Sequence, residues 1–437
     1  MYTSTSSSIK KSQAILFLSG SAGELDWVQP ILDDLLSRGF KLKIIFLTKH
    51  VLESVQKNRM CNDFITQDNS NLEVYTLGNY FFEKFERFGY LLHRISLKFK
   101  LERIFLLKFI LKILNAQLKV IFLKNLPEDL LSSKEEKYLF LSEYPSLRRP
   151  RDIWIKEEFT NSIFFYSPHS PHIYSKDLDK EYHDKVKINY EKKSFLLLGH
   201  PGDYSFINDG KELADPSLEQ IFIGHPKYSD KWLSQLKHKA EDFRSKYQSR
   251  KDLNILVLSR GYGSYLDEDS HINLIETTFE VIDELIPNCN IFVKKHPRES
   301  PSHWDEITKK FSSVSVVNDH ILQLATKADF VISYWGSGAM DCCSLGVPVI
   351  EYWNPDKQSK DQIRESNSFT TIYRKLGIVF PANDKKELKQ EITSMIENEC
   401  KSIPENHHPF FQELIYRSNH WSNSIEKILK AHGLIDN

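Results

Sequence analysis

Cationic side chains gather at positions 294 to 297 and form the strongest chemical signal in this sequence. Lys294, Lys295, His296 and Pro297 follow directly after the apolar run at 291–293. Such a run is typical of a buried parallel strand, and the ligands of open α/β sheets bind at the carboxyl ends of such strands. We therefore predict that Lys295 and His296 bind an anion, because charged donors form strong hydrogen bonds to one.

A second polar loop follows the apolar run at 330–332. Gly336, Ser337 and Gly338 precede a predicted helix at 339–345. Backbone N–H groups at a helix start suit a phosphate, and glycines leave them unobstructed. The alternative is a tight strand-to-helix turn that binds nothing. We expect this loop and the cationic loop to lie side by side in one nucleotide-binding half of the protein.

The first loop of the chain carries a carboxylate. Ser21, Gly23 and Glu24 lie between a predicted strand at 13–18 and a helix with apolar residues at helical spacing over 27–36. A carboxylate in this place can take a proton from a substrate hydroxyl. The alternative is a glutamate that only complements the dipole of the helix that follows.

Other polar residues also follow predicted strands. Arg260 and Gly261 stand in the first loop of the second half of the chain, where they would face the same ligand. His169 and His200 follow predicted strands of the first half and are candidates for the other side of the site. The alternative is that these histidines, which lie near prolines, only form turns.

Alternating strands and helices organise the chain. A strand, a helix that stops near Gly39 and a strand at 41–47 form a βαβ opening, which predicts a doubly wound parallel sheet. A chain of 437 residues is too long for one ordinary domain. We predict an α/β fold with two Rossmann-like domains, 1–220 and 221–405, that face a central cleft. C-terminal helices at 406–437 are expected to pack back on the domains.

The segment 81–126 is basic and amphipathic. Between Arg87 and Lys124 it has nine lysines or arginines and one acid, Glu102, interleaved with large apolar residues. One interpretation is a helix or helix pair that packs on the sheet with solvated lysines. The other is a surface that rests on an anionic membrane. No apolar run is long enough to span a membrane.

Composition argues against several classes of protein. The net charge of −1 gives no overall attraction to nucleic acid. The 5 cysteines are scattered without a C-x-x-C pair, so we expect reduced packing residues, among them Cys342 and Cys343, and no zinc site. The acidic run at 267–269 is interpreted as a solvated turn, and no metal or cofactor is predicted. The apolar stretch at 14–18 is too short for a signal sequence, so we expect a cytoplasmic protein, peripheral to the membrane's inner face if the basic segment binds lipid.

Two Rossmann-like halves with a ligand edge between them resemble the GT-B glycosyltransferases and the related non-hydrolysing UDP-GlcNAc 2-epimerases. Gly224-His225-Pro226 resembles the motif that starts the second domain in such proteins. Lys295-His296-Pro297 resembles the His-Pro motif of bacterial sialyl- and Kdo-transferases, whose histidine contacts the phosphate of a CMP-sugar. Asp341 falls where these families often place a ribose-binding glutamate, with a side chain one methylene shorter. The loop from Ser21 to Glu24 resembles the Kdo-transferase loop that carries the general base.

The resemblance implies an inverting, metal-independent glycosyltransferase without a cofactor. It would move a sugar from a nucleotide-sugar donor, with CMP-sugars favoured and UDP-sugars next, to a cell-surface polysaccharide or lipid-linked glycan acceptor. Glu24 would be the base and His296 the cation at the departing phosphate. The other donor-side residues would be Arg260, Gly261, Lys295, Pro297, Gly336, Ser337, Gly338 and Asp341, and the acceptor-side candidates are Ser21, Gly23, His169 and His200.

Three alternatives remain open at this point. A sugar-nucleotide 2-epimerase has the same architecture, although the second-half loop lacks that family's Ser-Gly-Gly-x-x-Glu-Glu pattern. A CDP-glycerol-type polyol-phosphate transferase uses a comparable His-Pro loop. A non-catalytic scaffold that associates with glycans or membranes is the third.

Overall fold

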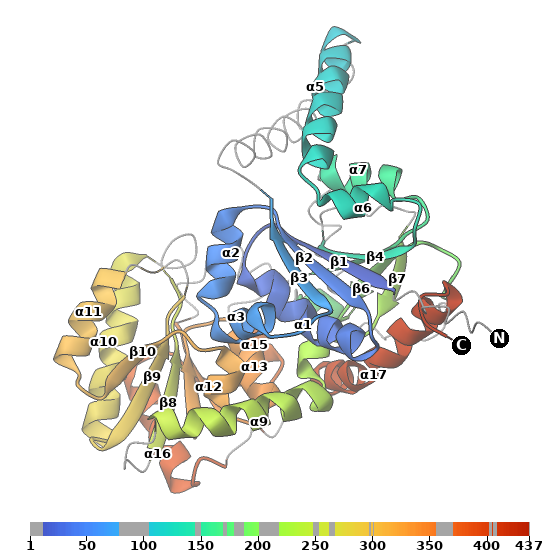
Figure 1. Ribbon diagram of the computed structural model, residues 1–437. Coiled ribbons are helices and arrows are strands. Elements are labelled where there is room, and N and C mark those ends of the chain that lie inside the picture. The colour runs from blue at the N-terminus through green and yellow to red at the C-terminus, as the bar shows by residue number, and fades with distance from the viewer. Residues whose placement is uncertain are drawn as a thin grey trace.

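The computed structural model describes residues 12–77, 105–144, 150–168, 173–178, 188–200, 218–247, 253–261, 267–296, 299, 301–354, 370–401, 404 and 409–436. Two parallel sheets, each with helices packed around it, form its frame (Figure 1). The prediction of an α/β fold with two Rossmann-like domains is therefore confirmed.

The first sheet has 7 strands in the order β3-β2-β1-β4-β5-β6-β7. The strands are β1 (Gln13–Leu18), β2 (Lys41–Phe46), β3 (Leu72–Thr76), β4 (Tyr138–Glu143), β5 (Ile163–Ser167), β6 (Ser194–Leu198) and β7 (Glu219–Phe222). The last strand pairs with β6 as far as Leu198 and Phe222. The predicted domain boundary between residues 220 and 221 thus falls inside β7, because this short strand completes the first sheet.

The α-helices described in the first domain are α1 (Ala22–Ser37), α2 (Lys49–Gln56), α3 (Arg59–Thr66), α5 (Phe105–Lys124), α6 (Glu128–Ser132) and α7 (Pro150–Glu158). The first three begin at polar caps. Ser21, Thr48 and Asn58 each accept a backbone N–H of the helix that follows, which satisfies a donor with no partner inside the helix. After α1 the chain turns at Gly39, whose φ of 84° favours glycine.

The second sheet has 6 strands in the order β10-β9-β8-β11-β12-β13. The strands are β8 (Leu253–Leu258), β9 (Cys289–Lys294), β10 (Val314–Val317), β11 (Phe330–Ser333), β12 (Val349–Tyr352) and β13 (Phe380–Ala382). The expectation that the loops after β9 and β11 are neighbours is wrong, because β8 lies between these two strands. In a doubly wound sheet the first strand is central and the chain reverses direction beside it.

Both sheets have such a reversal point, between β1 and β4 in the first domain and between β8 and β11 in the second. Ligands of open α/β sheets bind at these points, outside the carboxyl ends of the strands. A ligand-binding site is therefore expected at the loops that follow these four strands.

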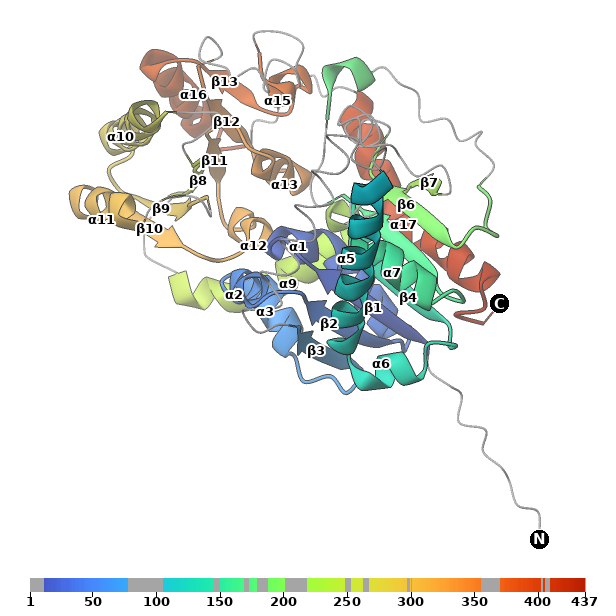
Figure 2. The same cartoon turned by 90° about the horizontal axis from the view of Figure 1, so that it is seen from above.

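The helices of the second domain are η4 (Pro226–Tyr228), α9 (Asp230–Tyr247), α10 (Glu268–Leu285), α11 (Pro301–Lys310), α12 (Ile321–Ala325), α13 (Gly338–Ser344), α15 (Ile372–Lys375) and α16 (Lys385–Glu397). The last helix, α17 (Pro409–Ala431), joins the domains (Figure 2). Phe410 and Leu414 at its start belong to the core of the second domain. Trp421 and Ile425 belong to the core of the first.

Helix α5 stands out from the body of the first domain (Figure 1). It covers the later part of the predicted basic segment 81–126, of which residues 81–104 lie outside the described part of the chain. Its end packs into the domain core through Phe122. Nearer its start, Phe109 is 57 % exposed and Ile113 is 44 % exposed. None of the helices that the structure describes is long and apolar enough to cross a membrane.

Candidate active site

Glu24 lies in the first turn of α1, at the carboxyl end of β1. Its Oε2 accepts the backbone N–H of Ser19 at 2.7 Å, and the Ser19 hydroxyl lies 3.2 Å from its Oε1. Gly20 leaves room for this arrangement, since a Cβ atom there would lie 2.4 Å from Glu24 Oε1. The loop after β1 therefore holds the carboxylate in one orientation, with 5 % of the residue exposed.

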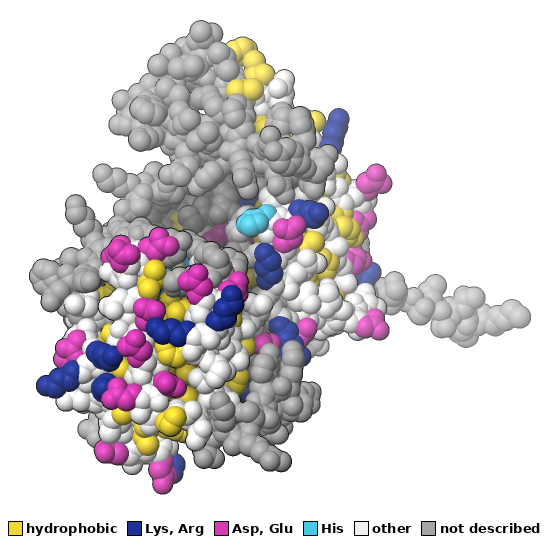
Figure 3. Space-filling view, turned by 90° about the vertical axis from the view of Figure 1, so that its left-hand side faces the viewer, with side chains coloured by type: hydrophobic (Ala, Val, Ile, Leu, Met, Phe, Trp, Pro, Cys, Tyr) yellow, Lys and Arg dark blue, Asp and Glu magenta, His cyan; other side chains and the backbone are white. Residues whose placement is uncertain are grey.

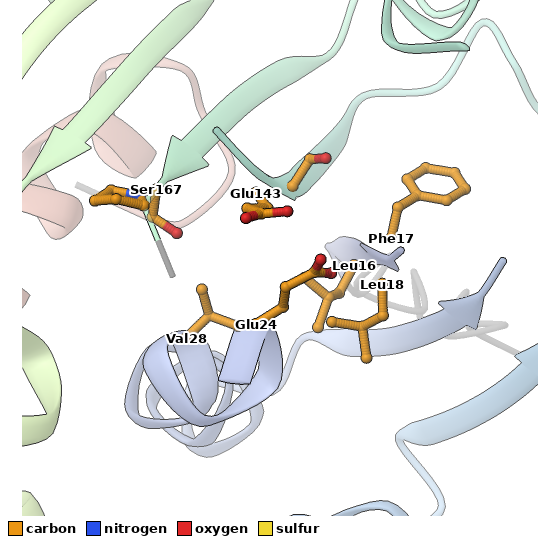
Figure 4. A pocket seen from close by; sticks show the side chains of 9 residues that line it. Leu16, Phe17, Leu18, Glu24, Val28, Glu143 and Ser167 are labelled. Atoms are coloured by element: carbon orange, nitrogen blue, oxygen red, sulfur yellow. The ribbon is translucent and has the colours of Figure 1, made fainter. Parts of the chain in front are cut away.

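A small cavity lies beside Glu24, between the ends of β1, β4 and β5 (Figure 4). Its internal volume is ≈ 10 Å³, about the space that one water molecule needs. Glu143 and Ser142, at the end of β4, also line it. Figure 4 shows the side chain of Glu24 on α1 and that of Glu143 at the end of β4 beside the same cavity.

Glu143 is a residue that the sequence interpretation missed. A signal was present, because Glu143 comes two residues after Leu141, the last residue of the apolar run at 138–141. The reversal point of the first sheet decides its importance, since it places the end of β4 next to the loop after β1. A carboxylate from the start of α1 and one from the end of β4 thus line the same cavity at the expected ligand edge.

The other acceptor-side candidates lie in three different settings. Ser21 and Gly23 share the Glu24 loop, where Ser21 Oγ accepts the Gly23 N–H at 3.3 Å and caps α1. His200 is fully buried at the end of β6, with its ring 4.8 Å from that of Phe410 on α17. His169 lies outside the described residues. The structure thus brings Ser21 and Gly23 to Glu24, whereas it places His200 against α17.

Arg260 and Trp335 form the contact across the reversal point of the second sheet. The guanidinium carbon of Arg260, in the loop after β8, lies 4.5 Å from the centroid of the Trp335 ring, in the loop after β11. The Trp335 backbone has a φ of 56°, a left-handed conformation that non-glycine residues rarely adopt and that often marks functional sites. This contact places Arg260 and Gly261 beside the loop of Gly336, Ser337 and Gly338. Trp335 was not among the predicted site residues.

Lys295 and His296 are half-buried at the end of β9. The backbone N–H of His296 donates to Glu299 Oε1 at 3.0 Å, and the indole N–H of Trp304 donates to the other oxygen of Glu299. Burial raises the pKa of Glu299 above its usual value. Glu299 therefore shapes the cationic loop, a role that the sequence interpretation did not assign. Pro297 lies outside the described residues.

Asp341 is buried in the first turn of α13. Its Oδ1 accepts the Tyr228 hydroxyl at 2.9 Å, and Lys227 Nζ lies 3.0 Å from Oδ1 and 3.2 Å from Oδ2. Both carboxylate oxygens thus contact residues of η4. The proposed contact between Asp341 and a ribose stays a prediction.

Lys227 also reaches the first domain. Its Nζ lies 2.9 Å from Asp26 Oδ2 on α1 and 4.5 Å from the centroid of the Trp27 ring. Burial alone would lower the pKa of Lys227, but the charges of Asp26 and Asp341 more than offset it, so the pKa lies above its usual value. Lys227 therefore remains an ammonium ion between two carboxylates.

His320 completes this group from the start of α12. Its Nδ1 accepts the Leu322 N–H at 3.2 Å, so Nε2 carries the proton and faces Asp26 Oδ1 at 2.6 Å. Burial raises the pKa of Asp26, whereas His320 and Lys227 lower it, and the result lies well below the usual value. We call Asp26, Lys227, His320 and Asp341 the interdomain charge cluster.

The segment before Lys227 is also packed between the domains. Gly224 has a φ of 72°, and a Cβ atom there would lie 2.3 Å from the Ser418 backbone nitrogen on α17. The His225 N–H donates to Ser418 Oγ at 2.9 Å, and the His225 ring packs at 4.5 Å from that of Trp27. Only glycine fits at position 224, which explains the glycine of the Gly-His-Pro sequence at this junction.

Cys342, Cys343 and Asp267 have structural roles. Cys342 is buried and Cys343 is partly buried, and burial raises the pKa of both thiols, that of Cys343 to about 12. Both cysteines are thus packing residues, as expected. Asp267 caps α10 by accepting the Ser270 N–H at 2.8 Å. Within the described ranges, no group of three or more His, Cys, Asp and Glu residues is arranged to hold a metal ion.

A family model described as a protein of unknown function (DUF354) matches residues 236–387. No curated protein matches the sequence. The UDP-GlcNAc 2-epimerase of Methanocaldococcus jannaschii is similar in structure, with a TM-score of 0.53, 11 % identity, and coverage of 95 % of this chain and 99 % of that one. The Neisseria meningitidis UDP-GlcNAc 2-epimerase bound to UDP-GlcNAc has a TM-score of 0.50 and 11 % identity. The match covers 95 % of this chain and 100 % of that one. A glycosyltransferase from Rickettsia africae has a TM-score of 0.48 and 11 % identity, and the match covers 97 % of this chain and 99 % of that one.

At these identities the similarity to the two epimerases concerns the fold alone. It extends over 95 % of this chain, in which two parallel sheets are described. This protein therefore has the two-domain α/β architecture of the GT-B type.

Proposed function

We propose that this protein is a nucleotide-sugar-dependent glycosyltransferase that acts with inversion and without a metal. The supporting observation is the chemical difference between the two reversal points. Glu24 and Glu143 meet at the first, whereas Arg260 meets the glycine-rich loop at the second. A carboxylate can act as the base that activates the acceptor, and cations can bind the phosphates of the nucleotide. The first domain therefore suits the acceptor and the second suits the nucleotide.

In the proposed reaction, Glu24 takes the proton of the acceptor hydroxyl while that oxygen bonds to the anomeric carbon of the donor sugar. The bond from this carbon to the phosphate oxygen breaks, and its electron pair leaves on the phosphate. His296, Lys295 and Arg260 stabilise the negative charge that develops there. Ser19 orients the base through its bonds to both oxygens of Glu24.

The donor is proposed to be a CMP-sugar, with a UDP-sugar as the next choice. The Lys295-His296-Pro297 motif supports CMP, because it resembles a motif that contacts the phosphate of CMP-sugars. The Neisseria meningitidis structure, which contains UDP-GlcNAc, supports a UDP-sugar. A thermal-shift screen with CMP, CDP, UDP and GDP separates these choices, because a ligand that binds the folded state raises its melting temperature.

Peripheral contact with an anionic membrane, on the cytoplasmic side, is also part of the proposal. The acceptor would be a lipid-linked glycan or a cell-surface polysaccharide. The support comes from α5, where Phe109, Ile113 and Val120 are 57 %, 44 % and 51 % exposed. Lys112 is exposed on the same helix. Figure 3 shows apolar and basic side chains together on this projection, a combination typical of interfacial helices.

The mechanism is tested with two variants. His296→Ala is expected to weaken nucleotide-sugar binding, whereas Glu24→Gln is expected to keep it and to lower transfer by about 10²-fold to 10⁴-fold. Near wild-type turnover of Glu24→Gln would show that Glu24 is not the base.

A UDP-GlcNAc 2-epimerase is the second candidate. The similarity to two such epimerases over 95 % of this chain favours it. Incubation with UDP-GlcNAc and no acceptor distinguishes the two functions, because only the epimerase converts the nucleotide sugar to its 2-epimer. A transferase leaves it unchanged until an acceptor is added.

A further inference from the structure

We propose that Lys227 is a positioning residue that couples the two halves of the active site. It would hold the helix that carries Glu24 against the helix that follows the donor loop, so that base and donor are aligned together. This inference rests on the proposed glycosyl transfer.

The position of Lys227 between two functional helices supports this role. Asp26 lies on α1, two residues after Glu24, and Asp341 lies on α13, three residues after Gly338. One ammonium group contacts both carboxylates, at 2.9 Å and 3.0 Å. A displacement of either helix would therefore break an ion pair inside the protein.

Burial makes this contact strong. Lys227, Asp26 and Asp341 are each at most 9 % exposed. Removing one partner of a buried pair leaves an uncompensated charge, which costs far more than the loss of a surface pair. The alignment of α1 with α13 is thus fixed more firmly than surface contacts could fix it.

Neighbouring contacts reinforce the coupling. Trp27, next to Asp26 on α1, belongs to the hydrophobic core of the second domain, and Lys227 Nζ lies over its ring at 4.5 Å. Tyr228 donates to Asp341 at 2.9 Å. His320 holds the second oxygen of Asp26 at 2.6 Å. Four elements (α1, η4, α12 and α13) therefore meet at this cluster.

The matched control is Lys231. Its Nζ lies 3.4 Å from Asp34 Oδ1, so it also links the second domain to α1, but its side chain is 65 % exposed. Exposed pairs contribute little, because water and salt screen them. Lys231→Met thus removes a lysine and an interdomain ion pair without touching the interdomain charge cluster.

The first experiment compares Lys227→Met, Asp26→Asn and Lys231→Met. Lys227→Met is expected to lower kcat by about tenfold to a hundredfold, the loss that a 1 Å shift of a catalytic group can cause. Its Kd for CMP or UDP should stay within about threefold of wild type, because Arg260 and the cationic loop belong to the second domain. Lys231→Met should keep both constants. Asp26→Asn, which leaves Lys227 paired with Asp341, replaces Lys227→Met if that variant does not fold.

Hydrogen exchange provides a measure of coupling that does not depend on turnover. In the wild type, CMP or UDP should slow amide exchange in α13 and also in α1. In Lys227→Met, only amides of the second domain should exchange more slowly when the nucleotide binds. Slowing in α13 alone in the wild type, or an unchanged kcat in Lys227→Met, overturns the coupling and leaves the proposed function intact. A wild type that binds no nucleotide and transfers no sugar overturns both.

Discussion

The guanidinium of Arg260 lies over the indole ring of Trp335, with 4.5 Å between the guanidinium carbon and the ring centroid. The two residues come from different loops, after β8 and β11, on either side of the reversal point of the second sheet. An arginine held over an aromatic face is restrained in orientation, and a guanidinium group can bind a phosphate through paired hydrogen bonds.

Replacing the ring of Trp335 tests this stacking. Trp335→Leu is expected to weaken the binding of CMP or UDP by about twofold to thirtyfold, because an aromatic–cation contact contributes roughly 0.5–2 kcal/mol. Trp335→Phe keeps a ring and should bind within about threefold of wild type. Isothermal titration calorimetry measures both, and equal affinity of the Leu and Phe variants would contradict a role for stacking.

Gly20→Ala tests the orientation of Glu24. The added Cβ would lie 2.4 Å from Glu24 Oε1, so the carboxylate must move. Transfer should fall at least about tenfold, since misplaced catalytic groups lose rate steeply, while nucleotide binding stays unchanged. In the double variant with Glu24→Gln, Gly20→Ala should cause no further loss. A further loss would mean that Gly20 acts independently of Glu24.

Glu143→Gln tests the second carboxylate of the cavity. The change replaces a carboxyl group that lines the same cavity as Glu24, and we expect kcat to fall by about 10-fold to 100-fold with donor binding retained. Glu135→Gln, at an exposed position before β4, is the control and should keep full activity. If both variants turn over at the wild-type rate, Glu143 only lines the cavity.

The interdomain charge cluster predicts an acid-dependent stability. Burial raises the pKa of Asp26, but His320 and Lys227 lower it well below its ordinary value of 3.8. A group whose pKa is lower in the folded state stabilises the protein above its unfolded pKa, and this contribution is lost as the pH falls toward the folded pKa.

Asp26→Asn measures that contribution. The variant should be less stable than wild type by about 1.5–3 kcal/mol near neutral pH, because the charge-assisted contacts of Asp26 with Lys227 and His320 are lost while Lys227 keeps its pair with Asp341. The difference in unfolding free energy, measured by urea denaturation, should stay constant between about pH 5 and 8 and shrink below about pH 4. A difference that is the same at pH 3 as at pH 7 would exclude Asp26 as the responsible group.

The basic segment 81–126 predicts binding to anionic vesicles. Reversing the charges of Lys98, Lys108 and Lys112 should reduce binding to phosphatidylglycerol vesicles by about a hundredfold or more, since each basic residue near such a surface contributes roughly 1 kcal/mol. The control reverses the charges of Lys385 and Lys389 on α16, and this change should leave vesicle binding unaffected. Absence of vesicle binding in the wild type would rule out the membrane contact.

Several elements could be predicted because their signals are local. Strand β1 has the predicted bounds, since an uninterrupted apolar run in a parallel sheet is buried on both faces. Strands β10 and β13 were not predicted. Both are short and partly exposed, and β13 contains Pro381, so neither has a strong apolar pattern.

Local sequence patterns were enough to predict the fold class and the polar loops that follow the strands, because helix and strand periods and loop residues are properties of neighbouring positions. That is why Glu24, Arg260 and His296 could be singled out. Which of these loops meet depends on the tertiary structure. Strand order placed β8 between β9 and β11 and brought Glu143 to Glu24. Domain docking brought Lys227 between Asp26 and Asp341, because contacts between distant segments depend on how whole sheets and helices pack rather than on any local pattern.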